Sequence, residues 1–163
     1  MQARINNPVL SIPGALDGIR EFAMSAHTTD LPAETIALIE LRVSQINSCS
    51  VCADMHSREL ELLGCSSERM HTLAAWREAP YFSDAERAAL ALAEAATRLA
   101  DNPESVSDEI WDEAARHYSE QQLSGLVVTI AAINAFNRLN ATTRQPTGPW
   151  VAQFVEQAMA AKA

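Results

Sequence analysis

The residues best suited to chemistry in this sequence are two cysteines and a histidine in the run CSVCADMH, positions 49–56. If the run is helical, Cys49, Cys52 and His56 lie at i, i+3 and i+7, which places them on one face. Two thiols this close can form a disulfide, and the imidazole can reach the second sulfur. Backbone N–H groups at a helix start stabilise a thiolate, so we expect a lowered pKa for one of the two thiols. The pattern predicts thiol redox chemistry.

A complete thiol relay also needs a proton acceptor, and Glu40 is the candidate. It lies upstream, within the otherwise largely apolar segment 38–43. A carboxylate in such surroundings tends to have a raised pKa and can carry protons. The structural alternative is a salt bridge, for instance with Arg42.

Metal binding is the main chemical alternative for the cysteine pair. Cys49, Cys52 and His56 could supply three zinc ligands, with Cys65 or His71 as the fourth. Structural zinc usually has four ligands, often from two paired motifs, and no second C-x-x-C or H-x-x-x-H is present. We therefore expect no metal, and because the sequence has no flavin, haem or nucleotide motif, we expect no cofactor.

Composition narrows the class of protein. The chain has 163 residues, 48% of them hydrophobic, and a formal net charge of −9, which fits one folded domain spanning 1–163. The sequence has no cluster of basic residues, so we do not expect it to bind nucleic acid. The N-terminal residues do not resemble a signal peptide, and the longest apolar run, about 126–133, is too short to cross a membrane. We expect a cytoplasmic protein, and in a reducing compartment a C-x-x-C pair is more often catalytic or metal-binding than structural.

The elements that must position these residues are helices. Helix-forming residues dominate, and no segment shows the sustained alternation typical of strands, so the sequence predicts an all-α fold. Ser83 and Glu86 have capping-box spacing, and Asn47 or Ser48 is expected to cap the helix that carries the cysteines. Helices are expected at about 14–27, from 31, 48–63, 67–76, 83–99, 108–118, from 119 through 139, and after 149.

Other polar and aromatic residues receive structural interpretations. Asn134, Asn137 and Asn140 share a helix with Arg138, which predicts caps or a hydrogen-bonded interface rather than catalysis. The three tryptophans are expected to be packing anchors. Several nearly apolar helices offer more apolar surface than one bundle covers, which predicts a homo-oligomer.

Residues 41–56 resemble the core motif of the carboxymuconolactone decarboxylase family, and most closely its AhpD-like alkylhydroperoxidase branch. The likeness continues over segments 73–78, 82–90 and 133–140, and it spans about residues 15–145 of the chain. The resemblance implies an all-α bundle that forms obligate trimers or hexamers. The implied activity is thiol-dependent reduction of a hydroperoxide.

The resemblance also implies roles for individual residues. Cys52 would attack the peroxide, Cys49 would resolve the product as a disulfide, and His56 would relay protons. The family places a glutamate twelve residues before the first cysteine, where this chain has Ala37. We expect Glu40, three residues further on and near the same helix face, to replace it.

Together these observations predict a thiol peroxidase or disulfide reductase. Its partners would be a hydroperoxide substrate, an external dithiol or redox protein that regenerates the thiols, and further copies of the chain. Two alternatives remain open at this point. One is a redox-sensing or binding protein whose disulfide state alters an interface without turnover. The other is a metal-binding helical module.

Overall fold

The computed structural model describes residues 2–101 and 103–160, and this part of the chain contains helices and no strand. The predicted all-α fold is confirmed. In chain order the helices are α1 (Pro8–Ser11), α2 (Ala15–Ser25), α3 (Ala33–Ile46), α4 (Ser50–Leu62), α5 (Ser67–Thr72), α6 (Asp84–Thr97), α7 (Asp108–His117), α8 (Glu120–Thr143) and α9 (Pro149–Ala160). Short 3-10 turns follow α2, α5 and α6 at Ala26–Thr28, Leu73–Ala75 and Leu99–Asp101.

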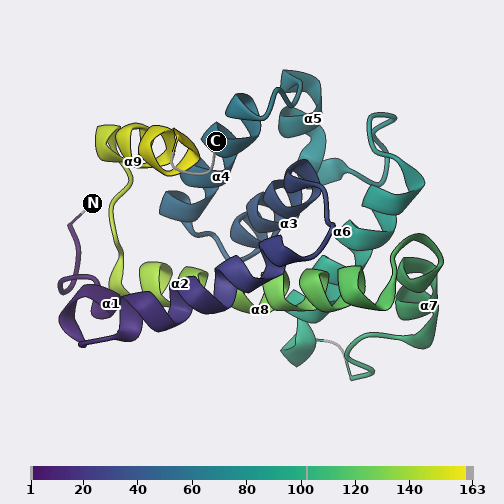
Figure 1. The fold of residues 1–163 in the computed structure, drawn as a ribbon, viewed down its shortest axis with the longest axis horizontal. Helices are drawn as coiled ribbons and strands as arrows, with labels where there is room; N and C mark the ends of the chain where they lie inside the picture. The colour runs from purple at the N-terminus through teal and green to yellow at the C-terminus, as the bar shows by residue number, and fades with distance from the viewer. Residues whose placement is uncertain (1, 102, 161–163) are drawn as a thin grey trace.

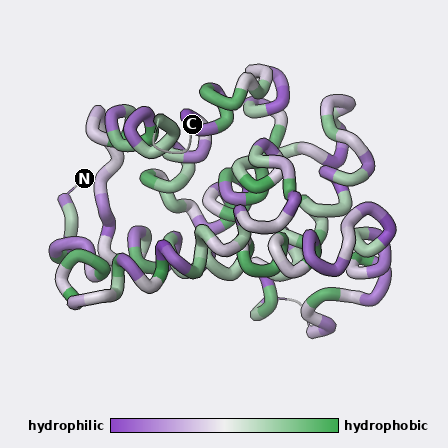
Figure 2. Tube along the Cα trace, viewed as in Figure 1, coloured by the Kyte–Doolittle hydropathy of each residue, from purple (hydrophilic) through white to green (hydrophobic). Residues whose placement is uncertain are grey.

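Helix α3 is the centre of the fold, and α4, α6 and α8 pack around it (Figure 1). Its residues 35–39 are all buried, which explains why the sequence there is almost continuously apolar. Figure 2 shows hydrophobic residues gathered along the middle of the molecule, around this helix. Helix α2 lies along the long helix α8, and α9 packs on α4.

Side-chain caps explain where several helices begin. Ser83 with Glu86, and Ser119 with Gln122, form complete capping boxes at the starts of α6 and α8. The cap of α4 differs from the prediction, because it is Cys49 rather than Asn47 or Ser48. Ser48 has a left-handed backbone (φ 55°), which turns the chain between α3 and α4 and leaves Cys49 extended at the cap position. The sulfur of Cys49 accepts the Cys52 N–H at 3.4 Å.

Gly125 lets the segment after α2 pass close to α8. A Cβ atom at this position would collide with Thr29 Oγ1 and lie 2.9 Å from Leu31 Cδ1. Gly125→Ala is therefore expected to lower the free energy of unfolding by about 1–3 kcal/mol. Gly18→Ala is the matched control, because Gly18 lies inside α2 with nothing within 4 Å of the added atom.

Thermal unfolding of both glycine variants checks this packing. Gly18→Ala is expected to stabilise the protein by about 0.5–1 kcal/mol through helix propensity alone. If Gly125→Ala raises the melting temperature as Gly18→Ala does, the close approach of the 29–31 segment to α8 is wrong.

The tryptophans do not all behave as expected. Trp76 is buried and its indole N–H donates to Glu94 at 3.0 Å, as a packing anchor should. Trp111 and Trp150 are 42% and 47% exposed, so the packing prediction is wrong for both. Helix α1 was not predicted, because a single turn of helix gives no periodic pattern to read.

Candidate active site

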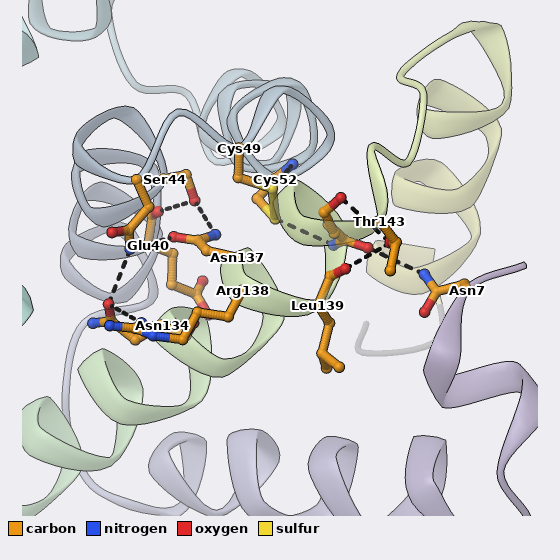
Figure 3. The surroundings of a disulfide bond; sticks show 12 residues. Asn7, Glu40, Ser44, Cys49, Cys52, Asn134, Asn137, Arg138, Leu139 and Thr143 are labelled. Atoms are coloured by element: carbon orange, nitrogen blue, oxygen red, sulfur yellow. Dashed lines mark hydrogen bonds between the residues drawn. A yellow bond between two sulfur atoms is a disulfide. The ribbon is translucent and has the colours of Figure 1, made fainter. Parts of the chain in front are cut away.

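The two cysteines lie at the start of α4, where Cys49 is the cap and Cys52 belongs to the first turn (Figure 3). They are joined as a disulfide, with Cα atoms 5.4 Å apart, within the range that such a bond requires. Both residues are buried, at 2% and 3% exposure. The C-x-x-C spacing at the start of α4 therefore brings the two sulfurs within bonding distance.

Cys52 lines a cavity of about 380 Å³, and Cys49 is not among the residues that line it. The walls come from six helices, drawn from both ends of the chain and from its middle, and most of the wall residues are apolar. The apolar wall consists of Val9 and Leu10 from α1, Leu16 from α2, Val51 and Met55 from α4, Ile133, Phe136 and Leu139 from α8, and Trp150 and Phe154 from α9. A small organic molecule in this cavity would contact Cys52 and not Cys49.

The predicted histidine and carboxylate also lie at this cavity. The Nδ1 atom of His56 is 3.2 Å from Glu40 Oε2 and 3.2 Å from Glu59 Oε2. All three side chains are mostly buried, and they also line a second cavity of about 310 Å³ next to the first. Glu59 was missed by the sequence reasoning, although its position one turn beyond His56 was a usable signal.

The position of the family glutamate is occupied by a core residue. Ala37 is 1% exposed and packs in an apolar cluster with Leu38, Leu41 and Leu60. Glu40 instead lines the cavity that Cys52 also lines. The proposed alternative partner of Glu40, Arg42, donates through Nε to Glu94 at 2.7 Å instead.

The structure does not bring together the zinc ligands considered from the sequence. Cys65 belongs to the apolar cluster that also contains Ala37 and Leu60, whereas Cys49 and Cys52 belong to a separate apolar cluster. Within residues 2–101 and 103–160, the group of three potential metal ligands that lie close together is Glu40, His56 and Glu59, which includes no cysteine.

Cys65 is buried, and its surroundings disfavour the thiolate form. Burial, and a hydrogen bond with Glu34, raise the pKa of its thiol to about 11. At pH 7 only about one Cys65 in ten thousand would be a thiolate, and the thiolate is the form that reacts. Alkylation of the reduced native protein at pH 7 is therefore expected to label Cys52, which lines a cavity, and to spare Cys65, as peptide mass spectrometry can show. Rapid labelling of Cys65 would contradict the raised pKa of its thiol.

An amide network connects α8 to the turn that precedes the disulfide. Asn47 donates to the side-chain oxygens of Asn134 and Asn137 at 2.9 and 3.0 Å. Asn137 is fully buried and donates to Ser44 Oγ at 3.1 Å (Figure 3). These contacts have the form of the predicted hydrogen-bonded interface, and they hold the end of α3 and the turn before α4 against α8.

Asn140 has a different contact, which the sequence reasoning missed. Its Nδ2 atom donates to the sulfur of Cys52 at 3.4 Å, and its Oδ1 atom accepts from Asn7 Nδ2 at 3.1 Å. A one-turn spacing from Asn137 was visible in the sequence, but nothing local indicated that this amide would face the sulfur.

Comparison with known proteins places this chain in a family. Residues 13–95 match the Carboxymuconolactone decarboxylase family. The uncharacterized protein YdfG of Bacillus subtilis is 39% identical over 106 residues, which cover 65% of this chain and 71% of YdfG. The uncharacterized protein YnjA of Escherichia coli is 34% identical over 110 residues, which cover 68% of this chain and 59% of YnjA. The chain belongs to the carboxymuconolactone decarboxylase family.

Solved structures place it near the AhpD-like members. A protein of unknown function from Agrobacterium tumefaciens, whose name links it to the antioxidant defence protein AhpD, superposes with a TM-score of 0.84 at 30% identity. That likeness covers 90% of this chain and 99% of the other. The debrominase Bmp8, solved in complex with 2,3,4-tribromopyrrole, shares the fold with a TM-score of 0.71 at 18% identity, over 92% of this chain and 79% of Bmp8.

None of the helices in the described part of the chain is long and apolar enough to cross a bilayer.

Proposed function

We propose that this protein is a thiol-dependent hydroperoxidase that reduces organic hydroperoxides. The observation that carries the proposal is the asymmetry of the cysteine pair. Cys52 lines an apolar cavity, and Cys49 lies behind it, bonded to it and outside the lining. An organic hydroperoxide would place its apolar part against the cavity walls and its O–O group at Cys52.

The proposed reaction has three balanced steps. The Cys52 thiolate attacks the terminal oxygen of the hydroperoxide, the O–O bond breaks, and the departing alkoxide takes a proton to leave as an alcohol. Cys52 is then a sulfenic acid, which the Cys49 thiol attacks to form the disulfide and release water. An external dithiol reduces the disulfide by exchange and is itself oxidised. This cycle requires no metal or cofactor.

The pair formed by His56 and Glu40 is the proposed source of the proton. The imidazole lies 3.2 Å from the Glu40 carboxylate and lines the same cavity as Cys52. A protonated imidazole can favour the Cys52 thiolate and then protonate the alkoxide, while Glu40 holds the ring and shares its charge.

His56→Ala is expected to slow both alkylation of Cys52 and peroxide turnover, by roughly 10²–10⁴-fold for turnover if proton transfer limits it. Glu40→Gln is expected to slow turnover less and to have a smaller effect on alkylation. Glu59→Gln is the matched control, because it removes the other carboxylate at the same 3.2 Å distance from the ring. Equal turnover of Glu40→Gln and the parent, with His56→Ala impaired, would remove Glu40 from the relay.

The test of the activity is consumption of cumene hydroperoxide in the presence of dithiothreitol. The expected result is turnover that exceeds the uncatalysed reaction and that is faster with cumene hydroperoxide than with hydrogen peroxide, which cannot use the apolar walls. The Cys65→Ser variant is expected to match the parent. Formation of the disulfide without multiple turnover would instead indicate a redox-sensing protein, the alternative that the alanine at position 37 favours.

We also propose that the protein is a homo-oligomer, either a trimer or a hexamer, formed by the single domain 1–163. Several large apolar side chains are exposed in the isolated chain, and an interface between copies would cover apolar surface of this kind. They include Phe22, Met24, Leu62, Tyr81, Trp111 and Val127. Light scattering at micromolar concentration tests the assembly, and a stable monomer would contradict it.

A further inference from the structure

We infer that Asn140 is a further catalytic residue, which donates an amide N–H to the Cys52 sulfur, and that Asn7 is the residue that orients this amide. The role in turnover rests on the proposed function, whereas the contact is a feature of the structure. Both residues lie outside the segment 13–95 that matches the family.

The direction of the Asn140 amide follows from a chain of hydrogen bonds that begins at a backbone group. The N–H of Val9 can only donate, and it contacts the Asn7 side chain at 3.2 Å, so that atom of Asn7 is the oxygen. The remaining end of Asn7 is then the NH₂ group, and its partner on Asn140 must be the oxygen. The NH₂ group of Asn140 therefore faces Cys52, and a flipped amide would break this chain.

Asn7 is held in place by the far end of α8. The backbone N–H of Arg4 donates to the Thr143 carbonyl at 2.9 Å, and the Arg4 guanidinium donates to the Thr142 carbonyl at 2.9 Å. Gln145 donates to the Ile5 carbonyl at 3.0 Å. Segment 4–7 is thus tied to the last turn of the helix that carries Asn140. Asn7 also caps α1, so one side chain fixes both a helix start and the amide.

An amide donor matters here because the sulfur is buried. Cys52 is 3% exposed, and burial disfavours a thiolate unless hydrogen bonds replace the lost water. The Asn140 N–H stabilises negative charge on Cys52 when the pair is reduced. The helix N-terminus acts on Cys49 instead, whose sulfur accepts the Cys52 N–H. The titratable side chains that line the same cavity are Arg20 of α2, Glu40 of α3 and His56 of α4.

The test measures alkylation of Cys52 by iodoacetamide as a function of pH, in a Cys49→Ser, Cys65→Ser background where Cys52 is the single thiol. Asn140→Leu keeps the side-chain size and removes the donor. It is expected to raise the midpoint of the pH profile by about 1 pH unit, which slows alkylation near neutral pH by about tenfold. Circular dichroism of each variant confirms that the helical fold is intact.

Asn7→Asp separates orientation from capping. Aspartate can still accept the Val9 N–H, but it cannot donate to Asn140, so the Asn140 amide turns and loses the sulfur contact. The midpoint is expected to rise here too. Asn6→Asp adds the same charge to an exposed neighbouring position and is expected to leave the profile near the parent's.

The inference is overturned if Asn140→Leu has the parent's midpoint while it remains folded, or if Asn6→Asp shifts the profile as much as Asn7→Asp. Alkylation needs no peroxide, so the result is independent of the proposed activity. A shifted profile in a protein without peroxide turnover would support the Asn140 contact and reject the peroxidase proposal.

Discussion

Cys52→Ser is expected to abolish dithiol-dependent peroxide reduction, with a loss on the order of 10³-fold or more, because a serine hydroxyl is not ionised at neutral pH and cannot pass through a sulfenic acid. The cavity beside this sulfur would remain, since serine is slightly smaller than cysteine. The variant should therefore keep its fold and still bind a hydroperoxide. A coupled assay that follows dithiol oxidation measures the loss.

Cys49→Ser distinguishes the attacking thiol from the resolving one. It is expected to react with one equivalent of hydroperoxide and then stop, with Cys52 trapped as a sulfenic acid that a dimedone probe detects by mass. Serine is also a good helix cap, so the start of α4 should persist. The reverse outcome, in which Cys52→Ser gives the trapped species, would assign attack to Cys49, the thiol that the helix N-terminus favours.

The largest expected effect on stability is at Glu94, which is 8% exposed on α6. Its carboxylate accepts from Trp76 at 3.0 Å and pairs with Arg42 and Arg77 at 2.5 Å each. Glu94→Ala would leave the mostly buried Arg42 guanidinium and the Trp76 indole N–H without this acceptor. Removing one partner of such a group costs about 3 kcal/mol, or roughly 6–12 °C in melting temperature.

Glu113→Ala is the matched control for Glu94. Glu113 also pairs with an arginine, Arg116, at 2.6 Å, but both side chains are about half exposed. Its loss is expected to change the free energy of unfolding by less than about 0.5 kcal/mol. Similar losses for the two variants would show that the Glu94 cluster behaves as a surface pair.

Glu94 also predicts acid sensitivity. Burial alone would raise the pKa of this carboxyl, but hydrogen bonds from Arg77, Trp76 and Arg42 outweigh it and hold the pKa below its ordinary value of 4.5. The folded state therefore binds this proton less readily than the unfolded state. The stability that the Glu94 carboxylate contributes is fully present at pH values above 4.5, the ordinary pKa. It is lost as the pH falls through the lower pKa that this group has in the folded protein. Urea unfolding across this range should show a steeper acid loss in the parent than in Glu94→Ala.

The sequence was most informative where structure is local. Capping residues and apolar periodicity located α2 to α9, and the cysteine motif was correctly assigned to the start of a helix, with Cys52 and His56 inside it and Cys49 as its cap. These features depend on neighbours within a few residues, so they can be read without tertiary structure. The same reasoning failed at the cap of α4, because the left-handed backbone of Ser48 is set by the tight turn between two packed helices.

The rest of the site depends on contacts that no local pattern encodes. Asn7 and Asn140 are 133 residues apart, and their contact requires the position of segment 4–7 against α8. The sequence suggested Glu40 as the carboxylate that replaces the family glutamate, because position 37 is an alanine. The structure supplied the rotation of α3, which places Ala37 in the apolar core and Glu40 at the cavity.

The cavity around Cys52 is built from residues that range from Asn7 to Phe154, which has a consequence for synthesis on the ribosome. The cysteine motif emerges early, but the walls from α8 and α9 emerge roughly 80 to 100 residues later, or about 4–20 s at ordinary rates of translation. During that interval the two thiols have neither the apolar cover nor the Asn140 amide. Under the proposed function, the selective reactivity of Cys52 would therefore arise only after the C-terminal helices have docked.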